Sequence, residues 1–245
     1  MSEKEPNLEN VGHIESKEIP PKGREIDFYL FRHAEASGEG LDSELTERGK
    51  EQATKAAQNL LEQIIQNGGG VIKFLSSPVR RAKVTSEIMQ HAVRETLAKQ
   101  QIKDVRLMSP RDRDALRAAG VIGPLKERGI DDPIDYWLKN PDALEGKSPT
   151  ETAQKLQGMI NFFQKIADRL PAGEKIYYIG VTHEVPQAAF LHEVSGQTLN
   201  ELGGNIQNCE SIKIELVGKS DEGAIIKFRN EEMKTSNPKD ETGLE

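Results

Sequence analysis

The sequence is poor in cysteine, in aromatic residues and in long apolar runs. Its 245 residues include one cysteine, Cys209, so no disulfide can form within the chain. No apolar stretch approaches the roughly 18 residues that span a bilayer, and Glu3, Lys4 and Glu5 put charge where a secretory signal would be apolar. A formal net charge of -7 argues against nucleic acid as the main partner. We therefore expect a cytoplasmic protein with no nucleic-acid or membrane partner.

Two common ligand-binding patterns are also missing. No set of His, Cys and Asp has the spacing of metal ligands. The run Gly68-Gly69-Gly70 lacks the Gly-x-Gly-x-x-Gly spacing of a dinucleotide loop and is typical of a flexible turn. The sequence therefore predicts neither a metal nor a cofactor.

Two short apolar runs each lead into a histidine. Residues 28–31 are followed by Arg32 and His33, and residues 176–181 are followed, after one threonine, by His183. Short runs rich in apolar and aromatic residues are typical of buried strands. Because open α/β sheets bind ligands at the carboxyl ends of their strands, we expect both histidines to lie at one edge of a sheet.

A third strand pattern leads to an arginine pair. Residues 71–75 are apolar except for Lys73, and Pro78 then favours the start of a helix that carries Arg80 and Arg81 in its first turn. A helix N-terminus already attracts anions, and guanidinium groups suit phosphate oxygens. The alternative is a solvated helix face. Together with a neutral imidazole that can attack phosphorus, these cations would suit phosphoryl transfer.

In these motifs the chain resembles the histidine phosphatase superfamily, which has the phosphoglycerate-mutase-like fold. The resemblance spans about residues 26–217. The family motifs Arg-His-Gly, Leu-Thr-x-x-Gly, Ser-x-x-x-Arg-Ala-x-x-Thr and Ser/Thr-His correspond here to Arg32-His33-Ala34, residues 45–49, residues 77–85 and Thr182-His183. Ala34 stands where the family usually has glycine.

The resemblance implies an α/β fold, a three-layer α/β/α sandwich with a mainly parallel sheet, and it implies roles for four residues. His33 would be the nucleophile that forms a phosphohistidine. Arg32, Arg81 and His183 would bind the phosphate oxygens. His183 should be protonated while it binds the phosphate, so we expect its working pKa to lie above the ordinary value of about 6.5.

Relatives often protonate the leaving group with a carboxylate between the arginine motif and the second histidine. Asp112 is the first candidate here and Asp114 the second, with a solvated helix start as the alternative reading of both. Glu184 is a third candidate, or a residue that only orients His183. Glu35 and Ser37 follow the nucleophile and are expected to line the mouth of the substrate site, or to be ordinary loop residues.

The domain organisation follows from composition and alternation. We expect a polar, disordered leader over residues 1–24, one domain over residues 25–229 with a helical insert at about 111–147, and a polar tail over 230–245. The other elements are expected as helices at about 46–66, 79–100 and 148–170, a strand at about 102–108, and a closing strand pair at 211–217 and 224–228.

Residues 36–44 lack the Trp-Asn and Gly-Trp elements of cofactor-dependent phosphoglycerate mutases. The resemblance therefore favours a metal-independent phosphatase that hydrolyses a phosphomonoester through a phosphohistidine. A protein phosphohistidine phosphatase and a non-enzymatic phosphate-binding module of the same fold are the alternatives. The partner would be a phosphorylated small molecule or a phosphoprotein.

Overall fold

The computed structural model describes residues 25–38, 40, 42–117, 120–171, 173–217 and 223–235. The predicted leader, residues 1–24, lies outside the described residues, and so does the tail from residue 236 onward.

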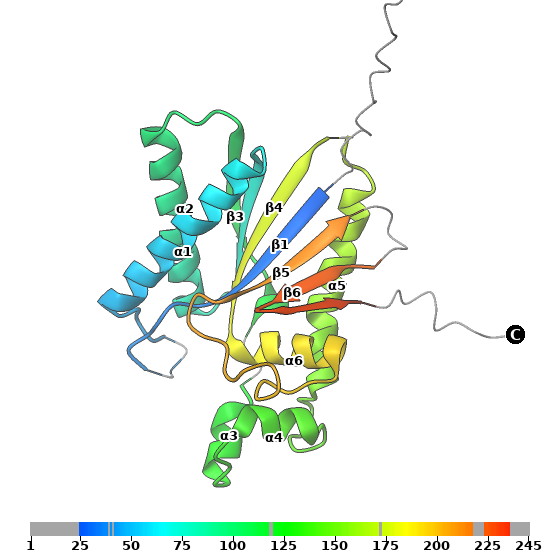
Figure 1. Cartoon of the computed structure of the whole chain (residues 1–245). Coiled ribbons are helices and arrows are strands. Elements are labelled where there is room, and N and C mark those ends of the chain that lie inside the picture. Colours follow the sequence, from blue (N-terminus) through cyan, green and yellow to red (C-terminus); the bar gives the residue numbers. More distant parts are fainter. Residues whose placement is uncertain are drawn as a thin grey trace, which may run out of the picture.

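A single sheet forms the centre of the described chain (Figure 1). Its seven strands follow the order β3-β2-β4-β1-β5-β6-β7. Their bounds are β1 Glu25–Arg32, β2 Gly70–Ser76, β3 Val105–Asp112, β4 Lys175–Thr182, β5 Ser211–Val217, β6 Ile225–Phe228 and β7 Glu231–Lys234.

The sheet is parallel in its core and antiparallel at one side. Strands β3, β2, β4 and β1 pair in parallel, whereas β5 runs against β1 and begins the antiparallel part with β6 and β7. In the parallel part, successive strands need helical crossovers between them. All the carboxyl ends of these strands consequently lie at one edge.

Helices cover both faces of the sheet, which confirms the three-layer sandwich. Helices α1 (Glu47–Gln66) and α2 (Arg80–Lys99) lie on one face, and α5 (Pro149–Ala167) and α6 (Glu184–Ser195) lie on the other (Figure 1). Hydroxyl side chains begin two of them, because Thr46 accepts a hydrogen bond from the Gly49 amide and Ser148 accepts one from the Glu151 amide.

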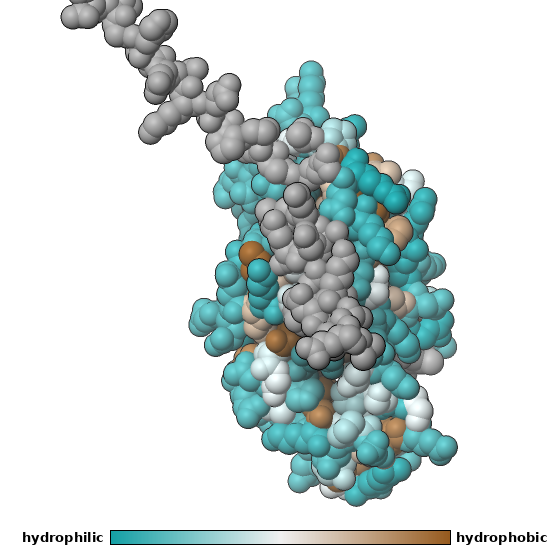
Figure 2. All heavy atoms as spheres, turned by 90° about the vertical axis from the view of Figure 1, so that its right-hand side faces the viewer, coloured by the Kyte–Doolittle hydropathy of each residue, from teal (hydrophilic) through white to brown (hydrophobic). Residues whose placement is uncertain are grey.

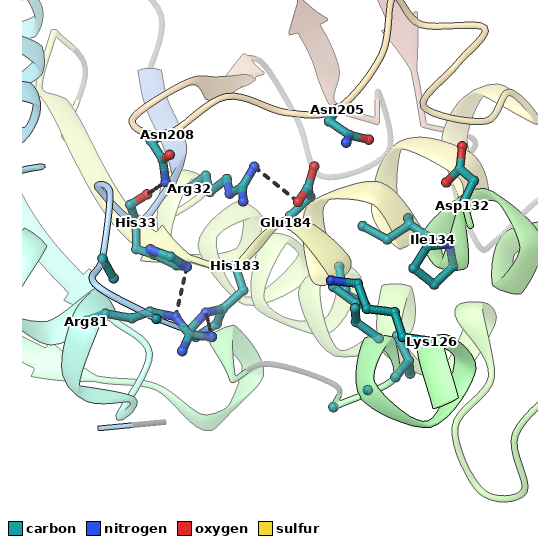
Figure 3. Close-up of a pocket in the computed structure, with 18 of the residues that line it drawn as sticks. Arg32, His33, Arg81, Lys126, Asp132, Ile134, His183, Glu184, Asn205 and Asn208 are labelled. Carbon is teal, nitrogen blue, oxygen red and sulfur yellow. Dashed lines mark hydrogen bonds and ion pairs between the residues drawn. The ribbon is translucent and has the colours of Figure 1, made fainter. Parts of the chain in front are cut away.

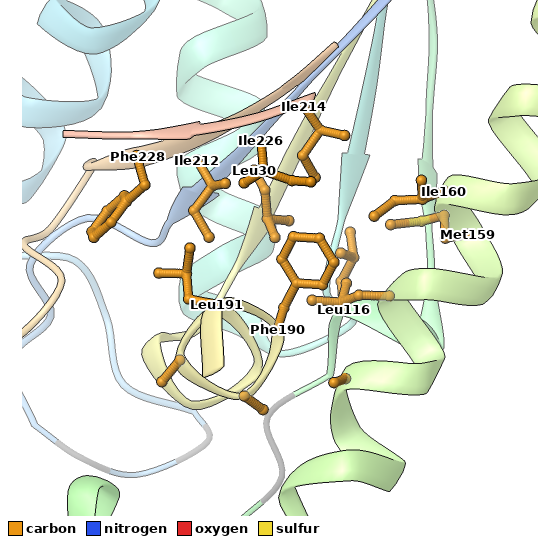
Figure 4. Close-up of a cluster of buried hydrophobic side chains, with 14 of the residues drawn as sticks. Leu30, Leu116, Met159, Ile160, Phe190, Leu191, Ile212, Ile214, Ile226 and Phe228 are labelled. Carbon is orange, nitrogen blue, oxygen red and sulfur yellow. The ribbon is translucent and has the colours of Figure 1, made fainter. Parts of the chain in front are cut away.

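The alternation of strand side chains divides the core in two. Phe28 and Leu30 of β1 pack in the cluster beneath α5 and α6, which Figure 4 shows, while Tyr29 and Phe31 pack in the cluster beneath α1 and α2. Burial on both faces explains why this strand is apolar along its whole length.

The segment between β3 and α5 differs from the expected insert at its start. Strand β3 continues to Asp112, beyond the strand end expected at about residue 108. The last residues of β3 are exposed and polar, as an edge strand allows. They lack the alternation of apolar and polar residues by which a strand can be predicted from sequence. Beyond it come the 3-10 turn Asp114–Leu116 and two short helices, α3 (Ile122–Glu127) and α4 (Pro133–Lys139).

The expected polar tail is also shorter than predicted, because residues 231–234 form β7 and pair with β6.

Hydrophilic side chains dominate the described surface seen in Figure 2, where hydrophobic ones appear singly. No helix among the described residues combines the length and apolarity needed to cross a bilayer.

Candidate active site

The two histidines meet because β1 and β4 are adjacent parallel strands. Arg32 is paired with Thr182 in the sheet register, and the next residue of each strand is a histidine. The His33 amide donates to the Thr182 carbonyl over 2.9 Å. The ring centroids of His33 and His183 are consequently 5.2 Å apart (Figure 3).

The hydrogen bonds of His33 define its tautomer. Nδ1 lies 2.8 Å from the carbonyl oxygen of Ala34, which can only accept, so Nδ1 carries the proton. Nε2 accepts from Nε of Arg81 over 2.9 Å. The lone pair of Nε2 therefore faces the guanidinium and is held ready for an electrophile.

His183 has the opposite arrangement. Its Nδ1 lies 3.3 Å from Nη2 of Arg81, which can only donate, so Nδ1 holds the lone pair. Its Nε2 then donates to Oγ of Ser77 over 3.0 Å. One guanidinium thus joins both imidazoles, and Ser77 fixes the far side of the second ring.

The loop that follows His33 is held by α1 and α2. The Ala34 amide donates to Oγ1 of Thr85 over 3.1 Å, and this hydroxyl donates to the Arg81 carbonyl. Ala34 is fully buried, and its φ is not positive. The position therefore needs no glycine on conformational grounds, which accounts for the departure from the family motif.

The Leu-Thr-x-x-Gly motif positions the same loop. Oγ1 of Thr46 donates to the Glu35 carboxylate over 2.9 Å, and its amide donates to the Glu35 carbonyl over 3.1 Å. A Cβ atom at Gly49 would lie 2.1 Å from that carbonyl oxygen. The first turn of α1 thus requires glycine for its close approach to the loop that follows His33.

Burial governs the titration of both rings. Burial and, secondarily, Arg81 and Arg32 lower the pKa of His33 to about 4. Burial, His33 and the two guanidinium groups lower the pKa of His183 to about 2. The expected rise of the His183 pKa concerns the ring in contact with phosphate, so it stays a prediction.

Arg32 is held by a buried carboxylate. Its Nη1 lies 3.1 Å from Oε2 of Glu184 and also donates to the Ile206 carbonyl. Burial raises the pKa of the Glu184 carboxyl, although Arg32 opposes this. Oε1 of Glu184 is buried without a hydrogen-bond partner among the described residues, so this carboxyl is a suitable carrier of a proton.

A cavity of about 980 Å³ opens above these groups. Arg32, His33, Arg81 and His183 form one end, here called the cationic end. The opposite side, here called the distal wall, consists of exposed polar residues beside apolar ones such as Ile134; its polar members are Lys126, Asp131, Asp132, Asn200 and Asn205 (Figure 3). Glu184 lies between the two regions.

Three residues that sequence reasoning placed at the site do not line this cavity. Asp112 accepts from Oγ of Ser76 over 3.0 Å and from Lys83 over 3.1 Å. Asp114 is exposed and pairs with Arg117, and Oγ of Ser37 donates to a neighbouring backbone carbonyl. Glu35 and Glu184, by contrast, do line the cavity.

Sequence reasoning missed three asparagines that the segment before β5 brings to the cavity, namely Asn200, Asn205 and Asn208. Asn208 donates through Nδ2 to the His33 carbonyl over 2.9 Å. This segment reaches the site because β5 is antiparallel to β1. No local sequence motif predicts such a pairing.

Within the described ranges, no three His, Cys, Asp or Glu side chains lie close enough together to bind a metal ion.

The family model of the histidine phosphatase superfamily (branch 1) matches residues 28–230. The protein therefore belongs to the histidine phosphatase superfamily, and its membership supports a phosphatase in general terms.

Solved structures share the fold. A mycobacterial glucosyl-3-phosphoglycerate phosphatase aligns with a TM-score of 0.56 at 16% identity, over 78% of this chain and 90% of that one. A structure described as mycobacterial hydrolase 1 aligns with a TM-score of 0.55 at 16% identity, over 87% and 98% of the two chains. No curated protein matches the sequence.

Proposed function

We propose that this protein is a phosphatase that hydrolyses a phosphomonoester through a phosphohistidine on Nε2 of His33. The observation that carries the proposal is the 2.8 Å contact of His33 Nδ1 with the Ala34 carbonyl, from which the tautomer follows. Because the Ala34 carbonyl holds the proton on Nδ1, the lone pair of Nε2 faces the cavity end where Arg81 lies.

The reaction has two displacements. Nε2 forms a bond to phosphorus while the bond to the leaving oxygen breaks, and that oxygen takes the electron pair and a proton. Water then attacks phosphorus, the P–N bond breaks, and its electrons return to Nε2. Positioning and charge stabilisation supply most of the catalysis in such transfers.

Three groups of the cationic end would bind the phosphate oxygens. Arg81 gives up its bonds to the two imidazoles and donates to the phosphate, and Arg32 donates from the side of Glu184. A phosphate dianion in contact with His183 favours the charged ring, so the pKa of His183, which burial lowers, rises when the substrate binds.

We assign the general acid to Glu184 rather than to Asp112. The Glu184 carboxyl lines the cavity, and burial raises its pKa, which favours a proton-donating role. After protonating the leaving oxygen, its carboxylate would accept the proton of the attacking water. Asp112 lies outside the cavity and is bound to Lys83.

The walls of the cavity favour a phosphorylated small molecule over a phosphoprotein. The segment that carries α3 and α4 stands opposite the catalytic residues (Figure 3). Pockets of several hundred cubic ångströms enclose small ligands, whereas a folded protein would have to bring its phosphoryl group past this segment.

The test is phosphate release from an aryl phosphate in EDTA by the wild type, by His33→Ala and by His91→Ala. His91 is exposed on α2 and serves as the matched control. We expect phosphate release by the wild type and the control, and a fall in the rate of release of about 10³-fold or more in His33→Ala.

A second experiment traps the intermediate. Rapid acid quenching should capture no phosphoprotein, and alkaline quenching should capture one, because phosphohistidine is acid-labile. Full activity of His33→Ala would exclude the mechanism, and transfer of the phosphate to a second hydroxyl instead of water would indicate a mutase.

A further inference from the structure

Asn208 contacts the nucleophile from a direction that none of the family motifs covers. Its Nδ2 donates to the carbonyl oxygen of His33 over 2.9 Å, and the residue also lines the cavity. The amide on the other side of the same peptide group, that of Ala34, donates to Oγ1 of Thr85 over 3.1 Å. The peptide plane between His33 and Ala34 is thus held at both ends by side chains from opposite sides of the loop.

The orientation of this plane sets where the next peptide group, which carries the Ala34 carbonyl, lies against the His33 ring. The carbonyl of Ala34 lies 2.8 Å from Nδ1 of His33 and keeps the proton there. If the peptide before it turned, the Ala34 carbonyl would move away from the ring. The proton could then shift to Nε2, which would cease to be a nucleophile.

The turn that presents Asn208 is built for a fixed position. Cys209 adopts a left-handed φ of 59°, and its amide donates to the Arg32 carbonyl over 3.1 Å. Glu210 closes the turn by accepting from the Gln207 amide over 2.7 Å, and Arg229 binds the Glu210 carboxylate. Burial raises the pKa of the Cys209 thiol to about 12, so the side chain stays a thiol. Cys209 therefore contributes through its backbone conformation and not as a thiolate.

We propose that Asn208 is a positioning residue that holds the His33–Ala34 peptide in the orientation that keeps Nε2 of His33 unprotonated. The inference rests on the proposed function of His33 and identifies what maintains its reactive form. Asn208 acts through the backbone of the nucleophile. Its side-chain amide is needed because it donates a hydrogen bond to the His33 carbonyl.

The test uses Asn208→Ala and Asn208→Asp, with Asn205→Ala as the control. Asn205 lines the same cavity, and no side-chain bond from it to His33 is present among the described residues. The aspartate variant keeps the size of the side chain but replaces the donor with an acceptor that faces a carbonyl oxygen. The readouts are the ¹⁵N shifts of the His33 ring in the ligand-free protein, which report the tautomer directly, and kcat and KM for an aryl phosphate.

We expect both Asn208 variants to show a mixture of tautomers and a kcat at least about tenfold lower, with KM changed by less than about threefold. Asn205→Ala should keep the wild-type tautomer. An unchanged tautomer in a folded Asn208 variant would overturn the inference whether or not kcat fell, because a fall in kcat alone would mean that Asn208 acts on the substrate. Since the ring shifts need no turnover, this result is independent of whether the wild type hydrolyses phosphate esters.

Discussion

The cationic end and the distal wall of the cavity differ in burial and in the contacts that hold them. At the cationic end, His183 is buried, and hydrogen bonds of 2.9 and 3.3 Å join Arg81 to the two imidazoles. At the distal wall, Asn200 and Asp132 are exposed, although their side chains are bonded to each other over 2.7 Å. The first region is formed by residues at the ends of β1 and β4 and by Arg81 in the first turn of α2, and the second by residues of and around α3, α4 and the segment before β5. The proposed chemistry therefore lies where the sheet and the start of α2 impose geometry, and the proposed selectivity lies in the connecting segments.

Replacing Arg81 should have the largest effect, because one side chain serves both histidines. Arg81→Lys keeps the charge but loses the planar fork that spans Nε2 of His33 and Nδ1 of His183. We expect kcat/KM for an aryl phosphate to fall by about 10²–10³-fold. Arg80→Lys, its exposed neighbour, is the matched control. Near-normal activity of Arg81→Lys would show that a point charge suffices at the cationic end.

The boundary between the two regions can be tested at Glu184. Glu184→Gln cannot supply a proton, so kcat for an alkyl phosphate should fall by about 10²-fold while an aryl phosphate, whose leaving group needs less help, is affected much less. Asp112→Asn should change neither rate by more than about twofold, because this residue bonds Ser76 and Lys83 outside the cavity. The reverse result would return the role of general acid to Asp112.

Burial at the cationic end also makes stability depend on pH. The pKa of His33 is about 4 in the folded protein and ordinarily 6.5, so the unfolded chain binds more protons between these values. His33 therefore contributes stability that is present above pH 6.5 and is lost as the pH falls towards 4. Urea unfolding at pH 7 and pH 5 should show that His33→Gln loses about 2 kcal/mol less than the wild type over this interval. An equal loss in both proteins would mean that the ring is not desolvated; His91→Gln is the control.

Changes at the distal wall should have the smallest effects. Asn205→Ala removes an exposed amide that faces the cavity (Figure 3). We expect KM for the preferred substrate to rise by about three- to tenfold with kcat unchanged, because one hydrogen bond to a ligand contributes about 1 kcal/mol. Asn59→Ala, on the exposed side of α1, should leave both constants unaltered. A fall in kcat comparable to that of Arg81→Lys would remove the distinction between the two regions.

Sequence reasoning succeeded where local pattern and sheet geometry coincide. The apolar runs before His33 and before His183 predict strands, and parallel pairing then requires their ends to meet, as β1 and β4 do. The convergence of Arg32 and Arg81 with these histidines follows from the same rule. The roles of these groups in the reaction stay predictions that the experiments above address.

The remaining differences arise from long-range structure. Asp112 seemed to begin an insert, but β3 extends through it as an exposed edge strand, where no apolar periodicity is needed. The sequence did not indicate a role for Asn208, because its contact with His33 depends on a strand that pairs in the antiparallel direction. The low pKa of His183 depends on packing around the ring, which no single sequence reveals.

The antiparallel direction of β5 has a consequence for how substrate preference can evolve. Its incoming segment, residues 198–205, reaches the cavity before the chain enters the sheet, and α3 and α4 reach it from the opposite side. Insertions and substitutions in either segment can reshape the distal wall while the register of β5 with β1 stays the same. Under the proposed function, new specificities can therefore be acquired by exchanging surface segments around an unaltered cationic end, and a laboratory selection for a new substrate would best diversify these two segments.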